Sequence, residues 1–253
     1  MRVLELFSGT GSVGRAFEAA GWEVTSLDAD LRTPADIHAD ILTFDFRVWH
    51  PGHFDVIWAS PPCTEYAIAR TTARTPRDFD LADRLVQKAI DAIIYLRPTV
   101  WWIENPATGL LRTRPVVEGL PYTLVDYCMY GAPYRKRTCL WTNVPISIAQ
   151  FQMCNRACGA FADGRHTSTA QRGPSRSLML VGIRDRRTLD ELHALPAPLC
   201  TRIVEATSAV LSGAVAQEPP LARYTVLPDA EPEPGQWPIP SAWDESRHIA
   251  FPL

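Results

Sequence analysis

Two reactive side chains follow apolar, strand-like segments of this sequence. Cys63 comes after residues 56–59 in the run Ser-Pro-Pro-Cys, and Glu104 comes after residues 100–103 in the run Glu-Asn-Pro. Paired prolines stiffen the loop before the thiol, and a thiolate is a nucleophile. A lone cysteine is more often a small buried residue. However, the carboxyl ends of neighbouring parallel strands meet at one edge of a sheet. Cys63 and Glu104 are therefore expected to lie in one cleft, which favours a role in covalent catalysis.

A glycine-rich turn precedes both of these residues. The run Glu-Leu-Phe-Ser-Gly-Thr-Gly-Ser-Val-Gly spans residues 5–14. Gly9 and Gly11 allow a tight bend near a ligand, and Gly14 allows close packing of helix on sheet. Asp28, about 20 positions later, is suited to accept the hydroxyls of a ribose. The spacing is shared by dinucleotide and S-adenosylmethionine (SAM) sites, so it predicts a nucleoside cofactor; a tight turn without a ligand is the alternative.

Alternating strands and helices must position these residues. The apolar runs predict strands at 3–6, 24–27, 56–59 and 100–103. Amphipathic stretches predict helices at 12–20, 79–96, 107–118 and 198–211. An antiparallel pair is expected at 122–130 and 138–142, and a further strand at 177–183. This alternation predicts a parallel sheet covered on both faces.

Three motifs, in this order, resemble those of the DNA (cytosine-5) methyltransferase family. They are Leu-Phe-Ser-Gly-Thr-Gly at 6–11, Pro-Pro-Cys at 61–63 and Glu-Asn-Pro at 104–106. The run Gly-Ala-Pro-Tyr-Arg-Lys-Arg-Thr at 131–138 resembles the later basic motif of the family, and the helix at 198–211 resembles its closing helix. The resemblance covers residues 1–143 firmly and 177–211 loosely. It implies an α/β fold with a doubly wound, Rossmann-like, SAM-dependent methyltransferase sheet and a small target-recognition insert.

The resemblance also implies a reaction. The expected activity is methylation of C5 of a flipped-out cytosine in double-stranded DNA, through a covalent bond between Cys63 and C6 of the base. Glu104 would hydrogen-bond the N3 and the exocyclic amine of the cytosine. Two alternatives stay open: a transfer-RNA-type cytosine-5 methyltransferase, and a nucleic-acid-binding homologue without activity. The small size resembles phage versions that protect DNA from restriction.

The family's cofactor residues carry over to eight positions. They are Phe7, Ser8, Gly9, Thr10, Gly11, Asp28, Asp40 and Pro62. Phe7 would lie against the adenine, Asp28 would hold the ribose and Asp40 would accept from the adenine amine. For Asp40, an exposed turn carboxylate is the alternative.

The basic motif departs from the family pattern. Tyr134 replaces the family's glutamine, and in strict register the two motif arginines fall on Lys136 and Thr138. A slip by one residue would use Arg135 and Arg137 instead, and we assign the catalytic role to these two because only a guanidinium makes planar bidentate contacts.

The family reads DNA sequence with a long variable region, which corresponds here only to residues 144–176. So short an insert predicts a short recognition sequence. Expected contacts to nucleic acid come from a loop at 70–77, the basic motif and the insert: Arg70, Arg74, Lys136, Arg165 and Arg172, with Arg156 and Arg176 as further candidates. A solvated arginine-rich surface is the alternative.

The same insert contains Cys154, Cys158 and His166. These are three of the four ligands that a structural zinc site needs, with Cys128, Cys139 or Cys200 as the fourth. The spacing matches no common zinc module, so small buried thiols are the preferred interpretation and zinc the alternative.

The net charge of −3 hides an uneven distribution. Residues 112–187 contain twelve Lys/Arg and four Asp/Glu, a local charge of +8, so the remainder carries −11. Because phosphate binding requires only a local basic surface, the charge is compatible with nucleic acid as partner.

Composition limits the class of protein. Of 253 residues, 46% are hydrophobic and 21% charged, which excludes global disorder. Six scattered cysteines indicate reduced thiols, and no apolar run is long enough for a membrane span. We expect a monomer in the cytoplasm of a bacterial host or phage-infected cell. The expected units are a catalytic SAM-binding domain at 1–143, the insert at 144–176, a return to the catalytic domain at 177–213, and a proline-rich acidic extension at 214–253.

Overall fold

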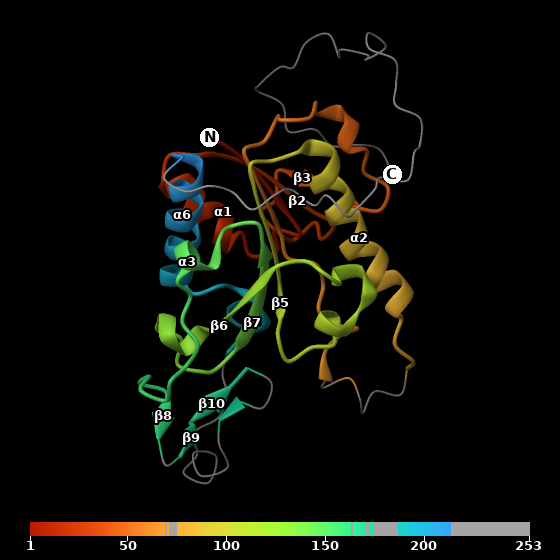
Figure 1. Cartoon of the computed structure of the whole chain (residues 1–253). Helices are drawn as coiled ribbons and strands as arrows, with labels where there is room; N and C mark the ends of the chain where they lie inside the picture. Colours follow the sequence, from red (N-terminus) through yellow and green to blue (C-terminus); the bar gives the residue numbers. More distant parts are fainter. Residues whose placement is uncertain (69, 71–74, 163, 171–172, 175–186, 214–253) are drawn as a thin grey trace.

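A seven-stranded mixed sheet forms the centre of the molecule (Figure 1). The computed structural model describes all residues except 69, 71–74, 163, 171–172, 175–186 and 214–253. The predicted strand at 177–183, the extension at 214–253, and the side chains of Arg74, Arg172 and Arg176 therefore lie outside the described residues.

The strand order is β3-β2-β1-β4-β5-β7-β6. The strands are β1 (Arg2–Leu6), β2 (Glu23–Asp28), β3 (Ile37–His38), β4 (Val56–Ala59), β5 (Val100–Pro106), β6 (Tyr122–Asp126) and β7 (Arg137–Thr142). Strands β1 to β5 pair in parallel, and β7 lies antiparallel between β5 and β6. The predicted doubly wound α/β sheet is confirmed, with the antiparallel pair at its edge.

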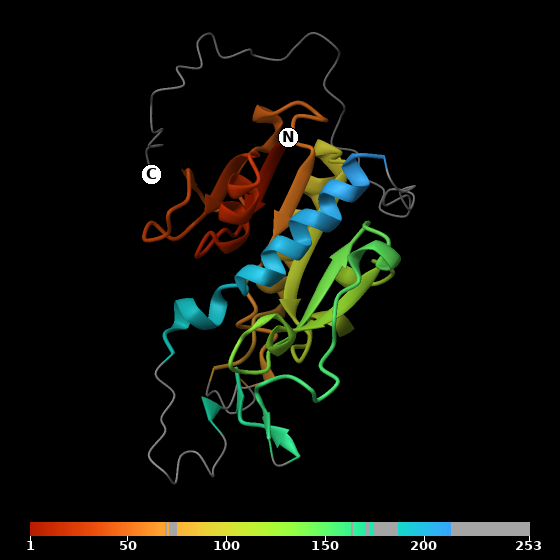
Figure 2. The same ribbon diagram turned by 90° about the vertical axis from the view of Figure 1, so that its left-hand side faces the viewer.

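Helices cover both faces of this sheet. Helices α1 (Ser12–Ala19) and α6 (Ala197–Leu211) pack side by side on one face, and α2 (Phe79–Leu96) covers the other (Figures 1 and 2). Val3 packs with the α1–α6 layer, whereas the adjacent Leu4 packs with the α2 layer. Because successive strand residues point to opposite faces and both faces are buried, the central strands are mostly apolar, with Glu5 and Glu104 among the exceptions.

The predicted helix at 107–118 is wrong. The segment forms two short 3₁₀ turns, η3 (Leu111–Thr113) and η4 (Pro115–Val117). Gly109 lies so close to Tyr66 that a Cβ atom there would come within 3.3 Å of the Tyr66 carbonyl oxygen. Pro115 has no N–H for a helical hydrogen bond and disfavours helix at the residue before it. The predicted strand at 122–130 likewise ends at Asp126 and continues as the 3₁₀ turn η5 (Tyr127–Tyr130).

The remaining small elements are one 3₁₀ turn between β3 and β4 and several elements after β7. They are η1 (Phe46–Val48), α3 (Ile146–Ala149), the hairpins β8 (Phe161–Ala162) with β9 (Arg165–His166) and β10 (Ser168–Thr169) with β11 (Gly173–Pro174), and α5 (Leu189–His193). In both views β8, β9 and β10 lie beyond the ends of β6 and β7, away from β2 and β3 (Figures 1 and 2). Among the described residues, no helix is both long enough and apolar enough to cross a membrane.

Candidate active site

A cavity of about 400 Å³ opens at the carboxyl ends of β1, β2, β4 and β5. The ends of the strands, the loops after them and the residue before β7 bring together most of the predicted site residues: Phe7, Ser8, Gly9, Thr10, Asp28, Asp40, Pro62, Cys63, Glu104 and Lys136. Gly11 does not line the cavity but stands directly before α1. The volume lies in the range of small-molecule sites, and the position is where open parallel sheets bind ligands.

The glycine-rich turn is held by Asp28. Gly9 and Gly11 have φ angles of 51° and 66°, which side chains disfavour. The Gly9 N–H donates to one carboxylate oxygen of Asp28 at 2.8 Å, and the Asp30 N–H donates to the other at 2.8 Å. These bonds fix the carboxylate at the mouth of the turn, while each oxygen keeps a lone pair for a further donor.

Glu5 is a cavity residue that the sequence reasoning did not assign. It lies within β1 with 3% of its surface exposed, and it accepts a hydrogen bond from the backbone N–H of Gly14. A Cβ atom at Gly14 would overlap the Glu5 carboxylate, so the absence of a side chain there allows α1 to approach β1, as expected. Burial raises the pKa of Glu5 to about 7. The available signal was an acidic residue inside an otherwise apolar strand.

Asp40 is exposed, and its side chain accepts a hydrogen bond from the Leu42 N–H at 2.9 Å. It therefore closes a turn, as the alternative interpretation expected, and it also lines the cavity.

The loop that carries Cys63 is joined by a hydrogen bond to the end of β5, the strand that carries Glu104. The side-chain amide of Asn105 donates to the carbonyl oxygen of Pro61 at 2.8 Å. Their strands, β4 and β5, are parallel neighbours, so both side chains reach the same cavity, as the spacing predicted. Glu104 is buried, and among the described residues its Oε1 atom has no hydrogen-bond partner. Because Glu104 lines the cavity and one of its buried carboxyl oxygens has no partner, the site is suited to a polar ligand.

Burial raises the pKa values of both catalytic candidates. For Cys63, desolvation is the main cause, the Glu104 charge raises the pKa further, and the Lys136 charge opposes them. For Glu104, desolvation is opposed first by Lys136 and then by the hydroxyls of Tyr127 and Thr138. Lys136 is thus the cation that favours the charged form of both groups.

The side chains of the basic motif at 135–137 point in two directions. Lys136 lines the cavity and is held there by donation from Nζ to the Leu192 carbonyl oxygen at 3.0 Å. Arg135 and Arg137 do not line it; both pair with the buried Asp126 carboxylate, at 3.1 and 2.8 Å.

This orientation corrects the register chosen from the sequence. Strand residues alternate in direction, so the side chains at 136 and 138 face Glu104 while those at 135 and 137 face away. The family positions in strict register, Lys136 and Thr138, are those whose side chains lie by the carboxylate.

One wall of the cavity comes from a distant part of the chain. His193 and Leu195 line it, and the Leu195 N–H donates to the hydroxyl oxygen of Ser12 at 3.2 Å. No periodicity or motif marked these two residues in the sequence.

The remaining nucleic-acid candidates differ in placement. Arg70 forms an ion pair with Glu65 and donates to the Pro76 carbonyl oxygen at 3.0 Å, so its side chain is tied to its own loop. Arg165 is exposed on β9. Arg74 and Arg172 lie outside the described residues.

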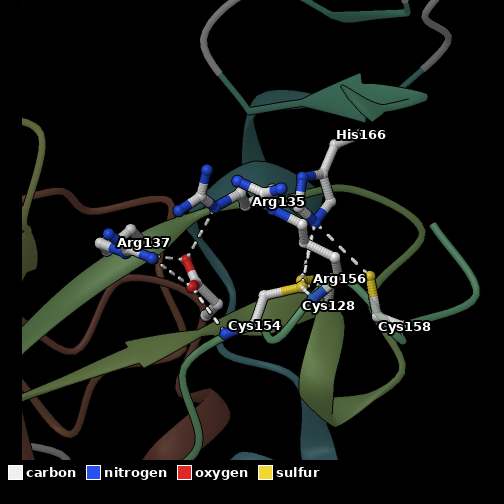
Figure 3. Close-up of polar contacts among 8 residues, drawn as sticks. Cys128, Arg135, Arg137, Cys154, Arg156, Cys158 and His166 are labelled. Carbon is white, nitrogen blue, oxygen red and sulfur yellow. Dashed lines mark hydrogen bonds and ion pairs between the residues drawn. The ribbon is translucent and has the colours of Figure 1, made fainter. Parts of the chain in front are cut away.

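The three candidate metal ligands of the insert lie together with a residue of the sheet edge. Cys128, Cys154, Cys158 and His166, named here the cysteine–histidine cluster, have ligand atoms within 4.8 Å of one another (Figure 3). Cys139 and Cys200, the other two residues considered for the fourth position, are buried elsewhere.

Comparison with known proteins gives two relatives in sequence. The chain is 37% identical over 172 residues to a probable DNA (cytosine-5)-methyltransferase of Frog virus 3 (isolate Goorha), covering 61% of this chain and 78% of that protein. It is 27% identical over 168 residues to the type II methyltransferase M.AgeI of Thalassovita gelatinovora, covering 54% of this chain and 38% of that protein. No family model matches the chain.

Comparison with solved structures finds matches that include two methyltransferases. A putative DNA modification methyltransferase encoded within an E. coli prophage has a TM-score of 0.40 and 18% identity, over 70% of this chain and 56% of that one. A mutant of Spodoptera frugiperda DNMT2 has a TM-score of 0.35 and 18% identity, over 55% of this chain and 49% of that one. The chain thus spans about half the length of these two structures.

The viral relative decides the family. More than a third of the aligned residues are identical, and the alignment covers most of the viral protein. The cavity also joins the glycine-rich turn, Cys63 and Glu104, the three motifs on which the resemblance rests. The chain belongs to the DNA (cytosine-5)-methyltransferase family.

Proposed function

We propose that this protein transfers a methyl group from SAM to C5 of a cytosine in double-stranded DNA, with the cytosine flipped out of the helix and joined covalently to Cys63. The observation that carries the proposal is the shared cavity of Cys63 and Glu104, next to a turn suited to a nucleoside. A base inside a duplex cannot reach such a cavity, so flipping is required.

The residues around the glycine-rich turn fit SAM. Asp28 accepts the ribose hydroxyls, Phe7 lies against the adenine and Asp40 accepts from the adenine amine, while the backbone of Gly9 lines the methionine part. When bound, SAM supplies an electrophilic methyl group on a sulfonium. These assignments rest on the family motif and on the lining of the cavity.

Cys63 makes C5 reactive. Its thiolate adds to C6, which forms an S–C6 bond and moves the electron pair of the C5=C6 bond onto C5. C5 bonds to the methyl carbon as the bond from that carbon to sulfur breaks, leaving S-adenosylhomocysteine. Loss of the C5 proton to a base and cleavage of the S–C6 bond then restore the double bond and release the thiolate.

Glu104 identifies the base and stabilises its charge. Burial raises the pKa of Glu104 and so favours the protonated carboxyl, which can donate to cytosine N3 while its other oxygen accepts from the exocyclic amine. The hydrogen bond to N3 strengthens as negative charge develops on the ring. Lys136, which favours the thiolate of Cys63 electrostatically, assists the addition step.

DNA binding is assigned to basic residues outside the cavity. The insert at 144–176 serves as target-recognition region, and Arg165 contacts phosphates. The small size of the insert supports a recognition sequence of few base pairs. We also propose that the chain is divided into the four units given above (1–143, 144–176, 177–213 and 214–253). We propose further that the protein is a monomer and acts in the cytoplasm of a bacterial host or phage-infected cell.

Methyl transfer from labelled SAM tests this proposal. Unmethylated duplex DNA and transfer RNA are compared as substrates, and products are identified by nucleoside mass spectrometry. We expect 5-methylcytosine in DNA with the wild type and with Cys200→Ala, a matched change of a buried cysteine outside the cavity, and none with Cys63→Ala. Product in transfer RNA alone would replace the DNA assignment. Absence of product on both would leave the inactive nucleic-acid-binding homologue.

A further inference from the structure

We propose that the cysteine–histidine cluster is a structural zinc site that fastens the insert to the edge of the catalytic sheet. Cys128 comes from η5, directly after β6, whereas Cys154, Cys158 and His166 come from the insert. The site is separate from the proposed catalytic cavity, because none of its four residues lines that cavity.

The distances match a tetrahedral site. The Nε2 atom of His166 lies 3.5 Å from the sulfur of Cys128, 3.3 Å from that of Cys154 and 3.4 Å from that of Cys158. The sulfurs of Cys154 and Cys158 are 3.5 Å apart. With Zn–S bonds of about 2.3 Å and Zn–N bonds of about 2.0–2.1 Å, the edges of a tetrahedron measure about 3.5–3.8 Å. For these four edges, shifts of a few tenths of an ångström admit the ion.

Hydrogen bonding alone does not explain this arrangement. One imidazole nitrogen either donates one hydrogen bond or accepts one, yet Nε2 of His166 faces three sulfur atoms (Figure 3). A sulfur–sulfur separation of 3.5 Å also exceeds the roughly 2.05 Å of a disulfide bond. A cation at the centre would satisfy all four atoms at once.

The donor set selects zinc. Three thiolates and one imidazole form a closed set of the Cys₃His type, which structural zinc sites use and which leaves no position for a reacting water. Cys154 also accepts a hydrogen bond from the backbone N–H of Arg156 at 3.3 Å, the kind of surrounding contact that orients and stabilises a metal-bound thiolate.

The insert needs such a fastening. Among its described residues, Val144, Ala149 and Ala160 are the buried apolar ones, which is little for a segment of this length. Units with so small a core are commonly stabilised by a metal or by disulfides. Polar contacts join the insert to the same edge: the Arg135 N–H donates to the Ser168 carbonyl oxygen at 3.0 Å.

The zinc site also supports the arginines of the basic motif. The backbone N–H of Cys154 donates to the Asp126 carboxylate at 2.9 Å, and this carboxylate holds Arg135 and Arg137. A metal bound to Cys154 thus fixes the donor that orients Asp126. We infer that loss of zinc loosens the insert and this arginine pair, and leaves the SAM-binding turn in place.

Metal analysis of the full-length protein, purified under reducing conditions, tests the site. We expect about one zinc per chain in the wild type and in Cys200→Ala, and substoichiometric zinc in Cys128→Ser and Cys158→Ser. Equal zinc in all four proteins would place the metal elsewhere and overturn the proposal. So would folded, reduced wild type that takes up no zinc when zinc is added.

A second measurement uses the wild-type protein, so it tests the site even if the cysteine variants do not fold. Cobalt-substituted wild type should show the visible bands of a tetrahedral ion and sulfur-to-cobalt charge transfer for three thiolates. An octahedral spectrum without thiolate bands would contradict the site. Chelation of zinc should also expose the insert to trypsin after Arg156 and Arg165, both exposed, before the sheet is cut. An insert that stays as resistant as in the zinc-loaded protein would contradict the fastening role.

Discussion

The side-chain amide of Asn105 lies 2.8 Å from the carbonyl oxygen of Pro61, and this hydrogen bond links the loop of the nucleophile to the strand end of the carboxylate. Asn105 is 1% exposed, so the bond is shielded from water. It sets the position of Cys63 relative to Glu104 through two rigid elements, a proline pair and a central strand.

Replacing Asn105 should therefore reduce turnover more than cofactor binding. In Asn105→Ala we expect kcat to fall at least tenfold, because a small misplacement of reacting groups is costly, while the affinity for SAM stays within about twofold. Steady-state kinetics and calorimetric titration with SAM measure the two effects.

Asn143 offers a matched control for this change. It is also buried, accepts from the Trp101 N–H at 3.0 Å and donates to the Thr99 carbonyl oxygen at 2.9 Å, but it does not line the cavity. Both variants should lose stability by about 1–3 kcal/mol, and only Asn105→Ala should lose kcat beyond the loss of folded protein. Equal loss of kcat in both would refute the positioning role.

The buried Glu5 predicts a pH-dependent penalty on stability. Burial raises its pKa from the ordinary 4.5 to about 7, so the folded state binds the proton more tightly than the unfolded state. Below about pH 4.5 both states are protonated and no penalty exists; between 4.5 and 7 it grows, and above 7 it approaches about 3 kcal/mol. Glu5→Gln keeps an oxygen for the Gly14 N–H and removes the charge.

Thermal unfolding of both proteins across pH 4 to 9, without SAM, measures this effect. The Tm of Glu5→Gln should exceed that of the wild type at pH 8, and the difference should shrink toward pH 5. A difference that is constant over this range, or that grows toward acid, would contradict the raised pKa.

The reactivity of Cys63 should depend on pH and on Lys136. Because burial raises the pKa of this thiol, its alkylation by iodoacetamide should have a midpoint above that of an ordinary cysteine. Lys136→Met removes the charge that opposes this shift and should slow alkylation at pH 8 several-fold. Peptide mass spectrometry separates Cys63 from the other five cysteines.

Arg135→Met is the control for Lys136→Met, since Arg135 lies outside the cavity and pairs with Asp126. It should leave the alkylation rate of Cys63 unchanged. If both variants slow the reaction equally, the effect of Lys136 is a general change of charge or fold and not a direct one.

The central sheet was predictable because its signal is local. The apolar runs at 3–6 and 100–103 must be buried on both faces, and a single pattern in the sequence reports this. The strands then determine where their carboxyl ends lie, so Cys63 and Glu104 could be expected in one cleft before any coordinates were known.

The failures have a different origin. The segment 107–118 has helical periodicity, but close contact of Gly109 with Tyr66 and the missing N–H of Pro115 override it. The direction of Lys136 depends on strand alternation relative to β5, which a motif with a one-residue ambiguity does not determine. His193 and Leu195 reach the cavity only through the tertiary fold.

The cysteine–histidine cluster lies between these cases. Cys154, Cys158 and His166 are close in sequence and could be proposed together, whereas Cys128 is one of three distant candidates that only the fold distinguishes. The fold places Cys128, in η5 directly after β6, next to the three insert residues.

Trapping of the covalent intermediate tests the central claim most directly. Duplex DNA that contains 5-fluorocytosine blocks the last step, because the fluorine on C5 cannot leave as a proton does. With SAM present, we predict a denaturant-stable complex in which mass spectrometry locates the methylated base on Cys63, with none formed by Cys63→Ala. Production of 5-methylcytosine from ordinary DNA without any such adduct, or with the adduct on another residue, would contradict covalent catalysis by Cys63.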